Sequence, residues 1–283
     1  MIEHFTHGPL TPAVAYAVSV IGSFVGLMFA ARARNSRGAA RGTWLTFSAL
    51  CLGGTAVWSM HFIAMLGFHV PGLSIRYDAM LTIASGLLAV VAMGLAQYLT
   101  VIHRGTGWLL AGGAIAGAGI VAMHYMGMAS INMHGHLGHD PLFVGLAVVV
   151  ALVAATVALW FTQRLKGVPS ILLASLVMGV AVSSMHYTGM FGMHVTVNES
   201  AGAASVPGST APELLLPLVV GLFVFLLVCS LLLMLGVDDS APRRGSQADR
   251  RDGEPVPDTA SPAEGTGRYN ARHSTGSAWD RPA

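Results

Sequence analysis

The chain has 283 residues, of which 54% are hydrophobic and 10% charged, and its formal net charge is +2. This composition excludes an ordinary soluble domain, because such domains carry about 25% charged residues. The small net charge says little about partners, and no nucleic-acid partner is expected. Cys51 and Cys229 both lie inside apolar stretches, which favours packed thiols over a disulfide.

Seven apolar stretches are long enough to cross ~30 Å of hydrocarbon, which takes about 20 residues each. The sequence therefore predicts an all-α, multi-pass protein surrounded by a lipid bilayer. Arginine strongly outnumbers lysine, and Ala and Gly are abundant, which suggests a bacterial gene and hence a bacterial plasma membrane. In chain order the predicted transmembrane helices are 10–31, 43–66, 78–101, 107–128, 142–163, 168–190 and 213–236.

The charged residues alternate between the two sets of loops. One set is basic and contains no acid: Arg32, Arg34, Arg37, Arg41, Arg104, Arg164 and Lys166. The other set, with the N-terminal segment, is mainly acidic. The positive-inside rule then predicts an outside N-terminus and a cytoplasmic C-terminus. Asp78 and Asp140 precede helices and are expected to cap them.

Residues 237–283 are polar and rich in Pro, Gly and charged residues, so they are predicted to be a disordered cytoplasmic tail. No catalytic domain fits in this segment. No nucleophile–base set and no nucleotide-binding loop is present elsewhere, so enzymatic activity is not expected. The N-terminus lacks a basic signal-peptide region, and the first helix is expected to be retained.

A short motif, Gly-x5-Met-His-aromatic-x-x-Met, occurs three times, at 54–65, 117–128 and 179–190. Its histidines, His61, His124 and His186, are 63 and 62 residues apart. This period covers two helices, so residues 10–197 are predicted to be three repeated helical hairpins, with the helix 213–236 outside them. Because each repeat holds an even number of helices, all three motifs should reach the same membrane face, predicted to be the outer one.

Helical spacing relates the residues of each motif. The histidine and the methionine four residues later are about 40° apart on an α-helix, and the glycine seven residues earlier lies on nearly the same face. A small residue there allows neighbouring helices to approach closely. The motif glycines with this expected packing role are Gly54, Gly117 and Gly179.

Three histidines at one depth of a membrane protein need polar partners, and a shared metal ion would satisfy them jointly. Methionine thioethers are soft ligands, which favours copper over zinc. The candidate ligands are His61, His124, His186, Met60, Met65, Met123, Met128, Met185 and Met190. The competing interpretation is that the methionines fill the core and each histidine hydrogen-bonds to a neighbour.

Two further groups accompany the motifs. The aromatic residues Phe62, Tyr125 and Tyr187 are expected to be interfacial rather than ligands, since the first copy lacks the hydroxyl. The histidine-rich segment 133–139 either delivers metal or is a polar loop with chance histidines.

At Met185-His186-Tyr187-Thr188 the sequence matches the signature of the bacterial MHYT domain, and residues 60–63 and 123–126 are degenerate copies. The chain resembles this family over residues 10–197. The resemblance implies a membrane sensor that binds copper through the motif Met and His residues and detects oxygen, carbon monoxide or nitric oxide. Many family members carry cyclic-di-GMP synthesising or degrading domains. Here only a short polar tail follows, so we expect a stand-alone module that signals to a separate cytoplasmic protein.

Two other functions are compatible with the residues. A copper transporter or acquisition protein would use the same outer histidines, but the inner halves of the helices offer few polar groups beyond Ser, Thr and Gln97. Bis-histidine haem ligation is a third possibility, which three equivalent histidines fit poorly.

Overall fold

The computed structural model describes residues 8–197 and 206–235, so the predicted tail 237–283 lies outside the described residues. Within these two ranges, seven helical spans are long and apolar enough to cross a membrane, which confirms the predicted all-α, seven-span fold. Single helices form six spans: α1 (Leu10–Asn35), α4 (Ala79–Ile102), α5 (Thr106–Ala129), α6 (Pro141–Arg164), α7 (Val168–Phe191) and α8 (Ala211–Leu235). The second span runs through α2 (Gly38–Ala49), η1 (Leu50–Ser59) and α3 (Met60–Met65).

The loop between the first two spans is shorter than predicted. Helix α1 continues to Asn35 and α2 begins at Gly38, so Arg32, Arg34 and Arg41 lie in helical turns rather than in a loop. Arginine is a good helix former, and cations are favoured in the last turn of a helix. Hydropathy predicts the end of a transmembrane helix at the first charged residue, whereas α1 continues past Arg32 and Arg34.

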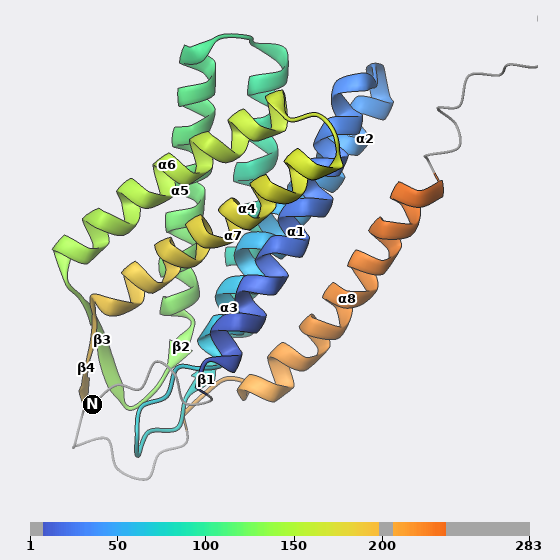
Figure 1. Cartoon of the computed structure of the whole chain (residues 1–283). Coiled ribbons are helices and arrows are strands. Elements are labelled where there is room, and N and C mark those ends of the chain that lie inside the picture. Colours follow the sequence, from blue (N-terminus) through green and yellow to red (C-terminus); the bar gives the residue numbers. More distant parts are fainter. Residues whose placement is uncertain (1–7, 198–205, 236–283) are drawn as a thin grey trace, which may run out of the picture. The chain divides into compact units, whose positions relative to one another are not determined.

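Six spans form a closed ring. Each span packs against the next along the chain, and α7 packs back against α1. Helix α8 lies outside this ring, against α1 and η1 (Figure 1). Cys51 of η1 and Cys229 of α8 are free thiols, and both are fully buried, as predicted. The apolar side chains that remain exposed on the helices suit contact with lipid.

Segment η1 is a π-helix of 10 residues. A π-helix has more residues per turn than an α-helix, so it rotates the residues that follow it relative to those before it. α-Helical spacing predicts that Gly54 and His61 lie on nearly the same face of the second span. Because the π-helix lies between them, this prediction does not hold.

We call the end of the ring where α3, α5 and α7 finish the histidine end. The connections there form two antiparallel strand pairs, β1 (Arg76–Tyr77) with β2 (Ile131–Asn132), and β3 (Gly135–His139) with β4 (Met193–Val197). From the sequence, loops are expected in these segments. The predicted caps are confirmed, since Oδ1 of Asp78 accepts from Leu81 N at 2.9 Å and Oδ1 of Asp140 from Leu142 N at 2.8 Å.

Candidate metal centre

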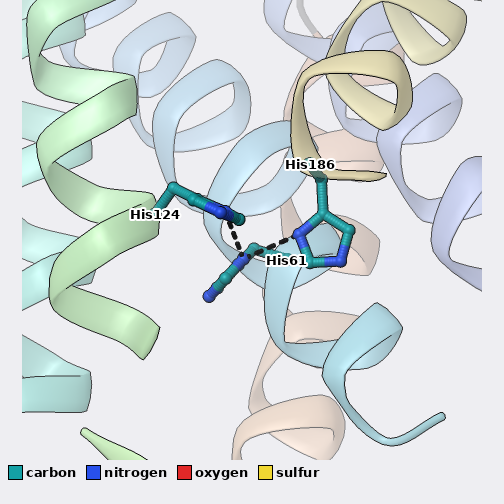
Figure 2. Close-up of side chains that lie close together, drawn as sticks. All are labelled: His61, His124 and His186. Carbon is teal, nitrogen blue, oxygen red and sulfur yellow. Dashed lines mark hydrogen bonds between the residues drawn. The ribbon is translucent and has the colours of Figure 1, made fainter. Parts of the chain in front are cut away.

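The three motif histidines meet in the interior of the ring. His61 lies on α3, His124 on α5 and His186 on α7, each within the last two turns of its helix. Each side chain is 1% exposed. Figure 2 shows the imidazoles of His124 and His186 converging on that of His61. Equal spacing in the sequence thus becomes one cluster in space, with one histidine from each repeat.

The Nδ1 atoms of these imidazoles face one another. His61 Nδ1 lies 2.9 Å from His186 Nδ1 and 3.2 Å from His124 Nδ1. One ligand nitrogen from each ring lies within 4.8 Å of the other two. This is the one group of three or more potential metal-ligating His, Cys, Asp or Glu side chains within the described ranges 8–197 and 206–235.

Hydrogen bonds alone cannot satisfy all three facing Nδ1 atoms. An Nδ1 atom carries either one proton or one in-plane lone pair, so His61 Nδ1 can form one well-directed hydrogen bond but not two. It nevertheless has two Nδ1 neighbours at hydrogen-bonding distance. A charged imidazolium would be costly in this apolar core, so protonation does not resolve the conflict.

The spacing fits a metal ion that takes one nitrogen from each ring. Nitrogens bound at about 2.0–2.1 Å in trigonal or tetrahedral geometry are about 3.3–3.6 Å apart. The two measured Nδ1 separations, 2.9 and 3.2 Å, are slightly shorter. Small outward movements of the rings would reach the coordination distance, so the residues present fit a trigonal metal site.

Two glycines leave room for the imidazoles. A Cβ atom at Gly127 would lie 2.5 Å from Nε2 of His61, and one at Gly189 would lie 2.5 Å from Nε2 of His124. Each glycine follows the histidine of its own helix by three positions and packs against the histidine of the preceding repeat. This role of Gly127 and Gly189 is not among the predictions from the sequence, although the Met-His-Tyr-x-Gly-Met pattern of the second and third copies contains the signal.

The aromatic residue after each histidine packs edge-on against it. Ring centroids are 4.9 Å apart for His61 and Phe62, 4.9 Å for His124 and Tyr125, and 5.0 Å for His186 and Tyr187. Phe62 is 0% exposed, so the interfacial position expected for it is wrong. Tyr125 and Tyr187 are half-buried, and so is Thr188. The aromatic rings therefore act as side walls of the cluster.

The motif methionines separate into two layers. Those four residues after each histidine belong to an apolar cluster at the histidine end, and those just before each histidine belong to the main core of the ring. All six are buried: Met65, Met128 and Met190 in the first layer, and Met60, Met123 and Met185 in the second. One set of methionines thus lies towards the histidine end and the other towards the main core of the ring. Coordination by sulfur stays a prediction.

The close helix approach expected at the motif glycines is present in the second and third copies and is shifted by one residue in the first. A Cβ at Gly117 would lie 2.9 Å from the Leu152 Cα on α6, and one at Gly179 would lie 2.7 Å from Val20 on α1. At Gly54 the nearest atom would be a side-chain methyl at 3.4 Å, whereas at Gly53 a Cβ would lie 2.7 Å from the Ala89 carbonyl oxygen. In the first copy the close approach therefore belongs to Gly53, because the π-helix changes the phase of this span.

The histidine-rich segment 133–139 forms most of β3, and β4 pairs with it. His139 packs edge-on against Tyr125, with ring centroids 5.2 Å apart. Its Nε2 atom is buried and has no hydrogen-bond partner among the residues that the structure describes. Burial lowers the pKa of His139, and nearby His194 lowers it further. The structure thus places one of the histidines outside the three motifs next to the wall of the cluster.

Comparison with known proteins gives a family match over most of the chain. A family model described as a bacterial signalling protein N-terminal repeat, MHYT, matches residues 54–114, 117–175 and 179–243. Each matched repeat begins within a motif copy, and the third extends through α8. No solved structure shows significant similarity to the chain.

Three curated relatives illustrate the similarity. The bifunctional diguanylate cyclase/cyclic di-GMP phosphodiesterase MucR of Pseudomonas aeruginosa is 38% identical over 199 residues, covering 68% of this chain and 29% of the relative. The cyclic di-GMP phosphodiesterase NbdA of the same organism is 35% identical over 221 residues, 76% of this chain and 27% of the relative. The signaling protein YkoW of Bacillus subtilis is 28% identical over 195 residues, 66% and 24% respectively. The chain spans less than a third of the length of these relatives.

Proposed function

Because this chain belongs to the MHYT family of bacterial signalling proteins, with seven spans in the bacterial inner membrane, we propose that it is a sensory module whose three buried histidines bind copper. The observation that carries the proposal is the convergence of three Nδ1 atoms, one from each repeat, with separations of 2.9 and 3.2 Å around His61. Neutral imidazole and thioether side chains form the donor set that suits copper best.

The three histidines would hold the ion. When bound, copper supplies a redox-active centre that can interact with a diatomic gas such as oxygen, carbon monoxide or nitric oxide. His61, His124 and His186 come from three different spans, so a change in their mutual distances requires movement of α3, α5 and α7 relative to one another. These helices continue towards the opposite end of the ring, where a cytoplasmic signalling protein would respond to the movement.

Two observations favour a sensor over the alternatives. A transport path would need a polar route beyond the histidines, but a cavity on that side of them has a volume of only about 20 Å³ and is lined by apolar side chains such as Leu52, Met93 and Ile120. Axial haem nitrogens lie about 4 Å apart on opposite faces of the porphyrin. The imidazoles of His61 and His186, with centroids 4.9 Å apart, leave no room for that ring.

Metal analysis tests the proposal. The full chain is expressed with copper, purified, and compared with His61→Ala, His124→Ala and His186→Ala for copper per protein and for copper oxidation state. Each variant should lose most of its copper. The matched control is His103→Ala, because His103 stacks on Trp108 at a centroid distance of 4.0 Å, just after the end of α4 away from the cluster. Unchanged copper in all three cluster variants would refute the site.

Signalling and transport are separated by a second measurement. Cells with and without the protein are compared for total copper. Equal accumulation supports a sensor, whereas accumulation that depends on the protein and on His124 would replace the sensory function with copper uptake.

A further inference from the structure

The end of the ring opposite the histidine end contains a recess of about 580 Å³. Segments from three connections line it: the turn between α1 and α2, the loop between α4 and α5, and the loop between α6 and α7. The basic side chains that line this recess are Arg34, Arg41, Arg104, Arg164 and Lys166. In the sequence these residues indicate only the orientation of the chain, whereas the structure places them around one recess.

No acid of the described residues balances this charge. The acids in ranges 8–197 and 206–235 are Asp78, Asp140 and Glu213, which lie at the starts of α4, α6 and α8. Those helix starts are at the other end of their helices from the recess. Like charges held together repel one another, and the repulsion is stronger next to an apolar protein than in open water. An anion in the recess would remove this cost.

Two of the guanidinium groups are held in place by backbone. The Arg34 guanidinium donates to the carbonyl oxygens of Thr162 and Leu165, at the end of α6. Arg41 Nε donates to the Ser36 carbonyl oxygen at 2.9 Å. Both side chains are half-buried. The recess therefore has ordered walls and is more than a set of mobile surface charges.

The other three cations remain available to a ligand. Arg104, Arg164 and Lys166 are exposed, and their side chains form no hydrogen bond or ion pair with the described part of the chain. Arginine forks and the lysine ammonium are the side chains that recognise phosphate oxygens. The positive-inside rule accounts for basic loops but not for their convergence, and Arg37, in the same turn as Arg34 and Arg41, does not line the recess.

We propose that this recess binds the phosphate group of an anionic ligand, supplied either by a phospholipid headgroup or by a soluble phosphorylated compound. The site is independent of the copper centre, because it shares no residue with the histidine cluster and lies at the opposite end of the ring. A ligand there would contact the ends of α1, α4 and α6 together and would thus couple the three hairpins at that end.

The test uses the full chain reconstituted in nanodiscs of phosphatidylcholine, which has no net charge. In one arm, inorganic pyrophosphate is titrated and followed by calorimetry. In the other, phosphatidylglycerol is included as a minor component, and the phosphatidylglycerol retained per protein is measured after purification. The variants are Arg104→Gln and Lys166→Gln, with Arg37→Gln as the control that removes the same charge outside the recess.

In whichever arm the wild type binds its probe, each recess variant should weaken that binding roughly tenfold, the usual effect of losing one charge-assisted hydrogen bond. Arg37→Gln should change it by less than about twofold, the size expected for a screened surface charge. Pyrophosphate binding identifies a soluble ligand, and phosphatidylglycerol retention without pyrophosphate binding identifies a lipid; either supports the site. Equal effects of Arg37→Gln and Arg104→Gln, or no binding of either probe, would overturn it. Copper content should stay at the wild-type level in all these variants.

Discussion

The Nδ1 atoms of His61 and His186 are 2.9 Å apart, although the two residues are 125 positions apart in the sequence. This contact joins the first repeat to the third, and the contact of His61 with His124 joins the first to the second. His61 is thus the shared member of the cluster. Any force that acts on its imidazole reaches all three repeats through two direct contacts.

Gly127→Ala and Gly189→Ala should damage the copper site without removing a ligand. The added Cβ would lie 2.5 Å from Nε2 of His61 or of His124, so the ring must shift. Overpacking of this kind costs about 1–3 kcal/mol. We expect lower copper content and a lower melting temperature in detergent. The matched control is Gly145→Ala on α6, where a Cβ meets nothing within 4 Å. The same copper loss in the control would contradict this explanation.

Gly53→Ala and Gly54→Ala should differ sharply although the positions are adjacent. A Cβ at Gly53 would lie 2.7 Å from the backbone oxygen of Ala89, whereas at Gly54 the nearest atom is a methyl of Val90 at 3.4 Å. We expect Gly53→Ala to lower the free energy of unfolding by about 1–3 kcal/mol and Gly54→Ala to change it little. Thermal melting of both variants measures this. The reverse order would mean that this span is an unbroken α-helix.

Removal of copper should destabilise the protein. An ion bound only by the folded state, at 100 times its Kd, adds about 2.7 kcal/mol to the free energy of unfolding. Copper-loaded protein should therefore melt at a higher temperature than protein treated with a copper(I) chelator. His124→Ala should show no such difference. A chelator effect of equal size in His124→Ala would place the stabilising ion elsewhere.

Asp140 should contribute to stability as a helix cap. Its Oδ1 accepts a hydrogen bond from Leu142 N at 2.8 Å at the start of α6. Asp140→Ala should cost about 1 kcal/mol, whereas Asp140→Asn should cost only a few tenths, since asparagine caps equally well. Melting temperatures at neutral pH distinguish the two. If Asp140→Asn is as damaging as Asp140→Ala, the charge of Asp140 matters and the cap alone does not explain its role.

The strand pair formed by β3 and β4 should be less stable in acid. Burial, and then the proximity of His194, lower the pKa of His139. The folded state therefore favours neutral His139, and its contribution is complete above the unfolded pKa of about 6.5 and is lost as the pH falls below it. Between about pH 7.5 and about pH 5, wild type should lose more thermal stability than His139→Gln. Equal losses would show that His139 does not contribute to the acid sensitivity.

The sequence alone was enough to predict the seven spans and the common level of the three histidines. Lipid satisfies no backbone hydrogen bond, so a long apolar stretch must be helical, and hydropathy reads this locally. Three motif copies with an even number of helices per repeat must reach one face. These conclusions need no knowledge of how the helices pack.

Only the tertiary structure decided which atoms meet. The facing Nδ1 atoms, the glycines beside the imidazoles and the basic recess all depend on how far each helix is rotated about its axis, which is set by packing with its neighbours. The π-helix of the second span shows why spacing fails here, since it moves the close approach from Gly54 to Gly53. Hydropathy is a property of one segment, whereas a site depends on how several segments pack together. Copper binding stays a prediction that metal analysis will decide.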